Sequence, residues 1–157
     1  MTRNKRVGAV AAVALTAAAL FLIFLFRPAR LVLCSADTGR VYRTWDAYDG
    51  MTFSVEFVHS VNKSPVCDIF EVRDRKIWAV ATRYSAFGAG VQTEIEEGQT
   101  LSYDEDGAMV VSGFDLSFPK LSYIVGTVSD HILSIQGEEI SLRELCGKNA
   151  AVVFEVR

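Results

Sequence analysis

An unbroken run of 20 uncharged residues, Val7 to Phe26, constrains this chain more than any other feature. The hydrocarbon core of a bilayer is about 30 Å thick, and an α-helix that rises about 1.5 Å per residue needs about 20 apolar residues to cross it. The sequence therefore predicts one N-terminal transmembrane helix. Residues 1–30 are expected to form a basic segment and anchor, and residues 31–157 a single domain.

A cleaved signal peptide is the main alternative to an anchor, because the three basic residues before the run suit both. Signal peptides have apolar regions of about 7–15 residues that end at a small-residue cleavage site. Here the run is longer, and Arg27 and Arg30 follow it. We therefore favour an uncleaved anchor over a signal peptide, and over a lipoprotein whose Leu-Val-Leu-Cys sequence ends at Cys34. Basic charge is slightly greater before the run, which favours a cytoplasmic N-terminus and an extracytoplasmic domain.

Charge is divided unevenly along the chain. All 19 Asp and Glu residues follow Arg30, and only 11 of the 16 Lys and Arg residues do, so residues 31–157 carry a net charge of −8. A domain this acidic repels phosphate backbones and anionic headgroups. We expect no nucleic-acid partner. We expect the domain to be held at the cell membrane by its anchor, on the periplasmic side or at the cell surface.

Beyond Arg30 apolar and polar residues alternate, which is the period of half-buried strands. Turn-forming sequences rich in Gly, Asn, Asp or Pro separate successive segments. Short strands at this spacing favour an all-β fold, an antiparallel β-sandwich or a barrel-like domain. The expected strands are residues 31–33, 41–45, 52–60, 66–73, 76–85, 109–112, 121–129, 131–136 and 151–156.

One short helix is expected, from Ser141 to Cys146. Ser141 is a suitable N-cap with Glu144 three residues later, and Gly147 follows the last helical residue. The sequence has no internal repeat and no linker long enough to divide residues 31–157.

The second predicted hairpin contains the main candidate site. With residues 62–65 as its loop, Phe57 faces Phe70 and one side of the hairpin is consistently apolar. The same register sets His59 opposite Asp68 at the end of that side, where the imidazole would hydrogen-bond the carboxylate. This arrangement is either a polar binding site at the rim of the core or a structural pair that closes the hairpin.

Several residues near this pair are candidates for ligand binding or partner contact. A Ser-His-Asp hydrolase is an alternative, but no oxyanion arrangement is visible, and the neighbours His59 and Ser60 point to opposite faces of a strand. We therefore expect no catalytic residue. The candidates for binding or partner contact are His59, Ser60, Asn62, Lys63, Ser64, Pro65, Asp68 and Glu71.

The other face of this hairpin sets Glu56 opposite Glu71. Like charges across a strand pair are destabilising, and Arg73 as a diagonal neighbour would offset them. A shared metal ion is the alternative, with His131 as the second histidine of the chain. We expect neither a metal nor a cofactor.

A small-residue segment, Phe87-Gly88-Ala89-Gly90, follows the fifth expected strand. Glycines on both sides of an alanine let a backbone approach something closely. The segment matches no phosphate-binding fingerprint, because no helix pattern follows it. A tight bend is one interpretation, and a ligand or partner contact by these four residues is the other.

Three cysteines, Cys34, Cys67 and Cys146, have no zinc-site spacing. They are either small buried residues or include one disulfide, for which Cys67 and Cys146 are the best pair.

Two blocks of residues in this order resemble a known family. They are His59-Ser60-Val61 with Ser64-Pro65-Val66 and acids at Asp68 and Glu71, and then the Phe87–Gly90 segment. The chain resembles the bacterial and archaeal domain-of-unknown-function 1850 family over roughly residues 31–156. The family usually continues its Gly-Ala-Gly with Leu-Pro, whereas Val91-Gln92 stands here.

Members of that family look like small proteins with one N-terminal hydrophobic segment, often encoded beside TRAP transporters of the TAXI type. The resemblance therefore implies an extracytoplasmic binding or assembly module that is accessory to a TRAP-type solute transporter. Its partners would be the membrane, through Val7–Phe26, and a transporter membrane subunit or solute-binding protein. A small hydrolase or metal-dependent enzyme using His59 and Asp68 is one alternative, and a purely structural β-domain is another.

Overall fold

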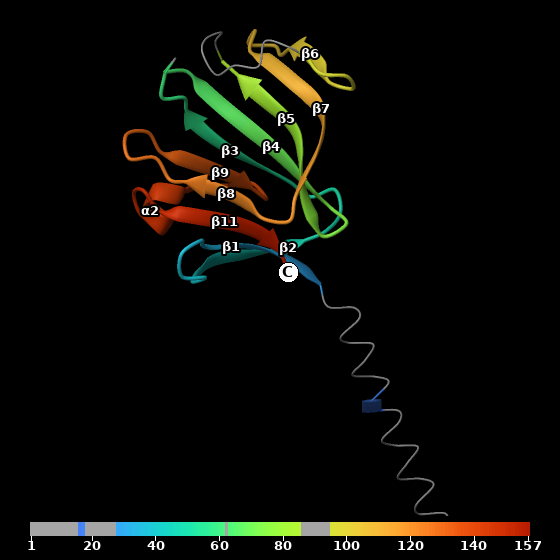
Figure 1. Ribbon diagram of the computed structural model, residues 1–157, viewed down its shortest axis with the longest axis vertical. Helices are drawn as coiled ribbons and strands as arrows, with labels where there is room; N and C mark the ends of the chain where they lie inside the picture. Colours follow the sequence, from blue (N-terminus) through green and yellow to red (C-terminus); the bar gives the residue numbers. More distant parts are fainter. Residues whose placement is uncertain (1–15, 18–27, 62, 86–94) are drawn as a thin grey trace, which may run out of the picture.

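The computed structural model describes residues 16–17, 28–61, 63–85 and 95–157 of the chain (Figure 1). The expected anchor, Val7–Phe26, lies outside this described part except for Thr16 and Ala17. Among the residues described, no helix has both the length and the hydropathy needed to cross a bilayer.

Two antiparallel sheets face each other, so the predicted all-β, sandwich-like fold is confirmed. The smaller sheet has four strands in the order β2-β1-β11-β8, and the larger has seven in the order β10-β9-β3-β4-β5-β7-β6. The smaller sheet consists of β1 (Ala29–Ser35), β2 (Val41–Ala47), β8 (Leu121–Ile124) and β11 (Ala151–Val156). The larger sheet consists of β3 (Thr52–Val58), β4 (Pro65–Arg73), β5 (Lys76–Tyr84), β6 (Thr100–Tyr103), β7 (Met109–Phe118), β9 (His131–Ile135) and β10 (Glu138–Ser141).

The hydrophobic core lies between the two sheets. Phe53 of β3 stacks on Phe70 of β4 and on Phe154 of β11, with ring centroids 5.2 and 5.5 Å apart. Phe154 is completely buried, as are Leu31 of β1 and Leu133 of β9. Each such side chain contributes about 1.5–3 kcal/mol by leaving water. Alternation along strands such as β3 and β9 gives the larger sheet an apolar face toward the smaller one, as the sequence predicted, whereas β1 is buried continuously from Leu31 to Ser35.

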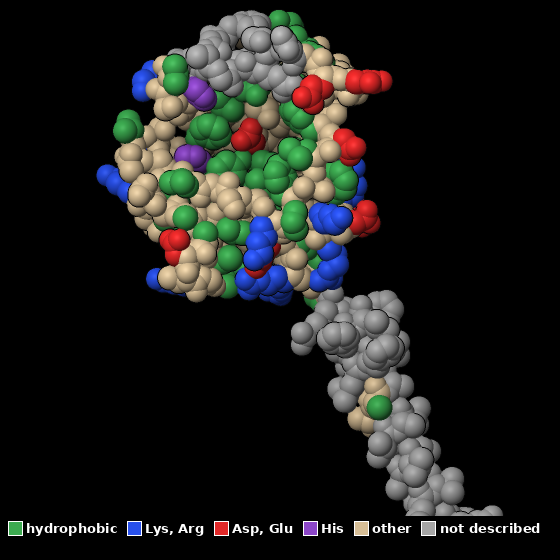
Figure 2. All heavy atoms as spheres, viewed as in Figure 1, with side chains coloured by type: hydrophobic (Ala, Val, Ile, Leu, Met, Phe, Trp, Pro, Cys, Tyr) green, Lys and Arg blue, Asp and Glu red, His purple; other side chains and the backbone are tan. Residues whose placement is uncertain are grey.

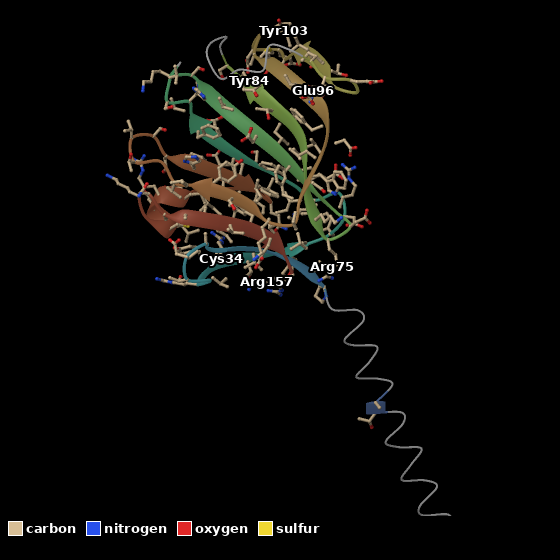
Figure 3. The ribbon with its side chains drawn as sticks, in the orientation of Figure 1. Cys34, Arg75, Tyr84, Glu96, Tyr103 and Arg157 are labelled. Atoms are coloured by element: carbon tan, nitrogen blue, oxygen red, sulfur yellow. The ribbon has the colours of Figure 1, made fainter. Side chains whose placement is uncertain are left out.

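The larger sheet extends beyond the smaller one. Figure 3 places Tyr84 and Tyr103, which end β5 and β6, at one end of the domain, and Cys34 and Arg157, from the smaller sheet and the residue after it, at the opposite end. All four residues of β6 are exposed. Part of the inner face of the larger sheet is therefore left without a covering sheet.

Most predicted elements are present, and two of them differ clearly in extent. The strand at β7 continues to Phe118, whereas β8 stops at Ile124. Two strands were not predicted, β6 and β10, both at edges of the larger sheet. The predicted helix is confirmed as α2 (Leu142–Cys146), whose N-cap Ser141 accepts a hydrogen bond from the Glu144 backbone N–H.

A bulge in β7 explains why this strand is longer than predicted. The β5–β7 register shifts between Ala79, which pairs with Leu116, and Ala81, which pairs with Ser112. Gly113 lies in the extra length of β7 with φ +82°, in the left-handed region that favours glycine. The bulge lets one strand continue past the point where β5 and β7 change register.

Replacing Gly113 by alanine is expected to destabilise the domain by about 1–3 kcal/mol. A Cβ atom there would stand 2.4 Å from the backbone oxygen of Gly98, in addition to the unfavourable φ. Gly107 is the matched control, because it has φ +79° but no atom within 4 Å of the added Cβ. Urea-induced unfolding of both variants should show the larger loss for Gly113→Ala, and equal losses would contradict the predicted contact.

The predicted register of the β3–β4 hairpin is wrong. Phe57 pairs with Val66 rather than Phe70, and Val55 pairs with Asp68. The loop is longer than predicted, because the ladder ends at the Val58–Pro65 pair and the His59 N–H donates to the Ser64 carbonyl. The shift is an even number of residues, so every side chain keeps its predicted face although its partner changes.

Candidate functional site

An open cleft of about 280 Å³ lies where β8, at the edge of the smaller sheet, faces β4, β5 and β7 of the larger sheet. Figure 2 shows a hollow on the visible face of the molecule, with hydrophobic side chains (green) around acidic side-chain atoms (red). We call this hollow between the sheets the Asp68 cleft. It is lined by Asp68, Phe70, Ala79, Ala81, Thr82, Phe114, Leu116, Phe118, Leu121, Ser122 and Tyr123.

Asp68 is the acidic group of this lining. It lies on the inner face of β4 in a row with Val66, Phe70 and Val72, which are all buried. Strand alternation places it there, since residues two apart share a face. The sequence therefore puts one carboxylate into an otherwise apolar row.

Two hydroxyl groups hold the Asp68 carboxylate. Thr82 of β5 donates from Oγ1 to Oδ1 over 3.0 Å, and Tyr123 of β8 donates from its hydroxyl to Oδ2 over 3.0 Å. Thr82 is the direct partner of Asp68 in the β4–β5 ladder. Tyr123 reaches it from the other sheet, so its hydrogen bond joins the two sheets at the cleft.

Burial controls the electrostatics of this group. Desolvation raises the pKa of Asp68, and the hydrogen bonds from Tyr123 and Thr82 offset part of that rise. Burial, together with the neighbouring Asp68 charge, also raises the pKa of Tyr123 far above its usual range, so its hydroxyl remains a donor. In the described part of the chain no Lys or Arg lines the cleft, and Asp68 forms no ion pair there.

His131 packs beside this pair at the start of β9. Its ring stacks on Phe57 with centroids 5.1 Å apart and meets the edge of Tyr123 at 5.8 Å. Its Nδ1 accepts a hydrogen bond from the Gly126 N–H over 3.1 Å, which places the proton of the neutral ring on Nε2. Desolvation lowers the pKa of His131. The imidazole is therefore a neutral neighbour of Asp68 at physiological pH.

A second cleft of about 280 Å³ adjoins His131 on its loop side. Both histidines line it, and each Nδ1 accepts a backbone N–H, from Val61 for His59 and from Gly126 for His131. No cluster of three His, Cys, Asp or Glu suited to a metal occurs among the described residues. This loop cleft is lined by Val58, His59, Ser60, Lys63, Gly126, Thr127, Val128, Ser129 and His131.

The structure separates the two residues that the sequence paired. His59 lies in the loop after β3 and lines the loop cleft, whereas Asp68 lines the cleft between the sheets. The predicted His59–Asp68 pair is therefore wrong, because it depended on the shorter loop. Thr82 and Tyr123 are the hydrogen-bonding partners of Asp68 instead.

The remaining candidates are dispersed. Ser60 and Lys63 line the loop cleft, Ser64 is buried, and Pro65 is the first residue of β4. Asn62 and the segment Phe87, Gly88, Ala89 and Gly90 lie outside the described residues.

Glu71 does not face Glu56. The predicted like-charge pair on the other face of the hairpin is therefore wrong. Thr52 is opposite Glu71, and Cys67 is opposite Glu56. Glu71 pairs with Arg73 over 3.0 Å. The like-charge pair that suggested a shared metal ion is therefore not formed.

All three cysteines are free. Cys34 is buried, and Cys67 and Cys146 are half-buried. Burial raises the pKa of the Cys146 thiol to about 11, so this thiol stays protonated at neutral pH.

Thr82, Phe114 and Tyr123 are site residues that the sequence did not reveal. They come from three strands, and only the packing of β8 against the larger sheet brings Tyr123 to Asp68. The available signal was Asp68 itself, an acid at an inward position between Val66 and Phe70.

The pKa of Asp68 predicts an unusual pH dependence of stability. An acid whose pKa is raised on folding binds more protons in the folded state, so the free energy of unfolding falls as pH rises through that pKa. Asp68→Asn removes this titration and can still accept from Tyr123 and donate to Thr82. We expect the variant to be more stable than the wild type at neutral pH, with the difference shrinking as pH is lowered.

Urea-induced unfolding at several pH values measures this difference. Asp115→Asn is the control, because Asp115 is an exposed residue of β7 and the change removes the same charge outside the cleft lining. A pH-independent difference between Asp68→Asn and the wild type would contradict the raised pKa.

Comparison with known proteins places the cleft inside one family. The model of a family described as "Domain of unknown function (DUF1850)" matches residues 53–142. The matched segment begins in β3 and ends at the first residue of α2, so it contains Asp68, Thr82, Tyr123 and His131. No curated protein and no solved structure gives a significant match to the chain.

Proposed function

The chain belongs to the family described as a domain of unknown function (DUF1850), and from this premise we propose that it is a binding module that holds a small ligand in the Asp68 cleft. One observation carries the proposal. A carboxylate without an ion pair among the described residues faces an open, mostly apolar cleft between two sheets.

The composition of the cleft supports binding of a small molecule. Sites of this kind are concave, largely apolar and equipped with a few polar groups that fix the orientation of the ligand. The aromatic rings of Phe70, Phe118 and Tyr123 supply apolar walls, and Asp68, Thr82 and Tyr123 supply the polar groups. Most of these residues lie on strands, which hold a site more precisely than loops do.

The setting of the domain supports a role beside a transporter. The sequence predicts a membrane anchor at Val7–Phe26, and the resemblance described above associates such chains with TRAP-type solute transporters. We propose that the domain works on the extracytoplasmic side of the membrane, as an accessory that presents its ligand to the transporter or to a solute-binding protein.

Filling the cleft tests this function in the full-length chain. Leu116 lines the cleft and is 51% exposed, so Leu116→Trp is expected to occupy the space without disturbing the core. Leu101→Trp on β6 is the control, because Leu101 is 39% exposed and lies outside the cleft lining. Both variants are expressed in cells that carry the neighbouring transporter genes but lack the natural copy of this chain.

Solute uptake and copurification with the transporter are the two measurements. We expect Leu101→Trp to restore uptake and Leu116→Trp to reduce it, with copurification unchanged in both. Full uptake without this gene would overturn the accessory role. Full uptake with Leu116→Trp would overturn the role of the cleft.

A further inference from the structure

The Asp68 cleft has a negative charge that none of its described lining residues balances. The two groups that hydrogen-bond the carboxylate, Thr82 and Tyr123, are neutral hydroxyls. The neighbouring His131 has a lowered pKa and is neutral. Arg83, which follows Thr82 on β5, pairs with Asp104 over 2.5 Å and does not line the cleft.

An ionised carboxylate in such a place is costly unless a cation joins it. From the described residues each Asp68 oxygen accepts one hydrogen bond, and a carboxylate oxygen has capacity for two. A ligand group that donates hydrogen bonds and carries positive charge would use the remaining acceptor capacity of these oxygens and balance the charge of Asp68. A protonated amine has both properties, whereas an alcohol has only the first and a carboxylate has neither.

Aromatic rings around Asp68 favour the same kind of ligand. Phe70 meets the edges of Phe118 and Tyr123 at centroid separations of 6.4 and 6.5 Å, and Phe114 joins them in the lining. The face of an aromatic ring attracts a cation by about 0.5–2 kcal/mol. The same rings cover the apolar body of a ligand, so the cleft offers one charged point and an apolar surround.

The volume of the cleft limits the size of the ligand. A water molecule occupies about 30 Å³ of liquid, so a cleft of about 280 Å³ has room for roughly nine non-hydrogen atoms of that size. An amine with a short alkyl or aryl body fits inside, whereas most of a peptide or a nucleotide would remain outside the cleft.

We infer that the Asp68 cleft binds a small organic amine, with its ammonium group on the free side of the Asp68 carboxylate and its apolar body against Phe70, Phe114 and Phe118. This inference rests on the proposed function, because it names the chemical class of the ligand that the binding module holds. The assignment distinguishes the cleft from one that would select anions or neutral solutes.

Three probes of similar shape separate these classes. The full-length chain in detergent is titrated with 2-phenylethylamine, with the isosteric 2-phenylethanol and with the anion phenylacetate, and binding is followed by calorimetry at neutral pH. We expect the amine to bind at least about tenfold more tightly than the alcohol, the gain typical of a hydrogen bond to a charged group. We expect no binding of the anion.

Variants then locate the bound amine. Asp68→Asn should weaken amine binding at least about tenfold and leave binding of the alcohol almost unchanged. Asp115→Asn removes the same charge outside the lining and should leave both unchanged. Phe114→Leu alters a wall that contacts the apolar body of both molecules, so it should weaken binding of the amine and of the alcohol to a similar extent.

The results distinguish this inference from the proposed function. Equal affinity for the amine and the alcohol, tighter binding of the anion, or no amine binding at millimolar concentration would each overturn the amine assignment. Solute uptake with Leu116→Trp would still test separately whether the cleft has a function in uptake. Should Asp68→Asn fail to fold, the three-probe comparison on the wild type decides the chemical class of the ligand, and Phe114→Leu still tests whether the ligand lies in the cleft.

Discussion

Replacing Phe154 by alanine is expected to lower the free energy of unfolding by about 3–5 kcal/mol, the usual cost of removing a buried aromatic ring. Phe154 is completely buried between the sheets, and its ring packs on Phe53 at 5.5 Å and on the edge of Tyr123 at 6.5 Å. The variant therefore removes the packing partner of Phe53 in the larger sheet and of Tyr123 in the smaller sheet. The paired strands around the cavity cannot move easily to fill it.

Urea-induced unfolding, followed by tryptophan fluorescence, measures this loss. Phe114→Ala is the control, because Phe114 is a half-buried phenylalanine on β7 that faces an open cleft rather than the closed core. We expect it to cost clearly less than Phe154→Ala. Similar losses for the two variants would show that the closed core is not where the stability of the domain resides.

Replacing Tyr123 by phenylalanine is expected to cost about 1.5–3 kcal/mol at neutral pH, the range for a hydrogen bond to a charged group. The change removes one oxygen atom and keeps the ring, so the packing on Phe57 and Phe154 is preserved. What is lost is the 3.0 Å hydrogen bond to Asp68, which leaves a half-buried carboxylate with only Thr82 as its partner.

Acid conditions should reduce that cost. When Asp68 is protonated, the hydrogen bond that Tyr123→Phe removes is no longer charge-assisted and is weaker. Because burial raises the pKa of Asp68, the reduction begins at a higher pH than for an exposed aspartate. Thr82→Val removes the other hydrogen bond and should show the same pH trend. If Tyr123→Phe lowers the free energy of unfolding by the same amount at every pH, the hydrogen-bonding partner of Tyr123, Asp68, is not ionised in the folded protein.

The sequence predicted the strands of this domain because alternation requires only local information. It also predicted the face on which Asp68 lies, although the partner of Asp68 was wrong. Side chains in a strand repeat every two residues, so an error of four residues in the sum of paired positions leaves each face intact. The length of the loop after Val58 decides that register, and composition alone does not fix it.

The two strands that were not predicted, β6 and β10, have no buried apolar face. In β6 every residue is exposed, and in β10 both glutamates are exposed, so neither segment has a full apolar face to alternate. Each is an edge strand that forms because a neighbour offers hydrogen bonds. The Tyr123–Asp68 contact was beyond sequence reasoning for a related reason: 55 residues separate the two, and no strand pairing connects β8 to β4.

The order of strands in the smaller sheet gives the Tyr123 hydrogen bond a mechanical meaning. Tyr123 is on β8, β8 pairs with β11, and β11 pairs with β1, whose first residue is Ala29. A ligand that lengthens or shortens the Tyr123–Asp68 hydrogen bond would therefore strain the hydrogen bonds between only three strands, β8, β11 and β1. The last of these strands, β1, begins at Ala29, directly after the N-terminal part of the chain, so a ligand in the cleft and a pull on the N-terminal part of the chain would act on one continuous set of hydrogen bonds.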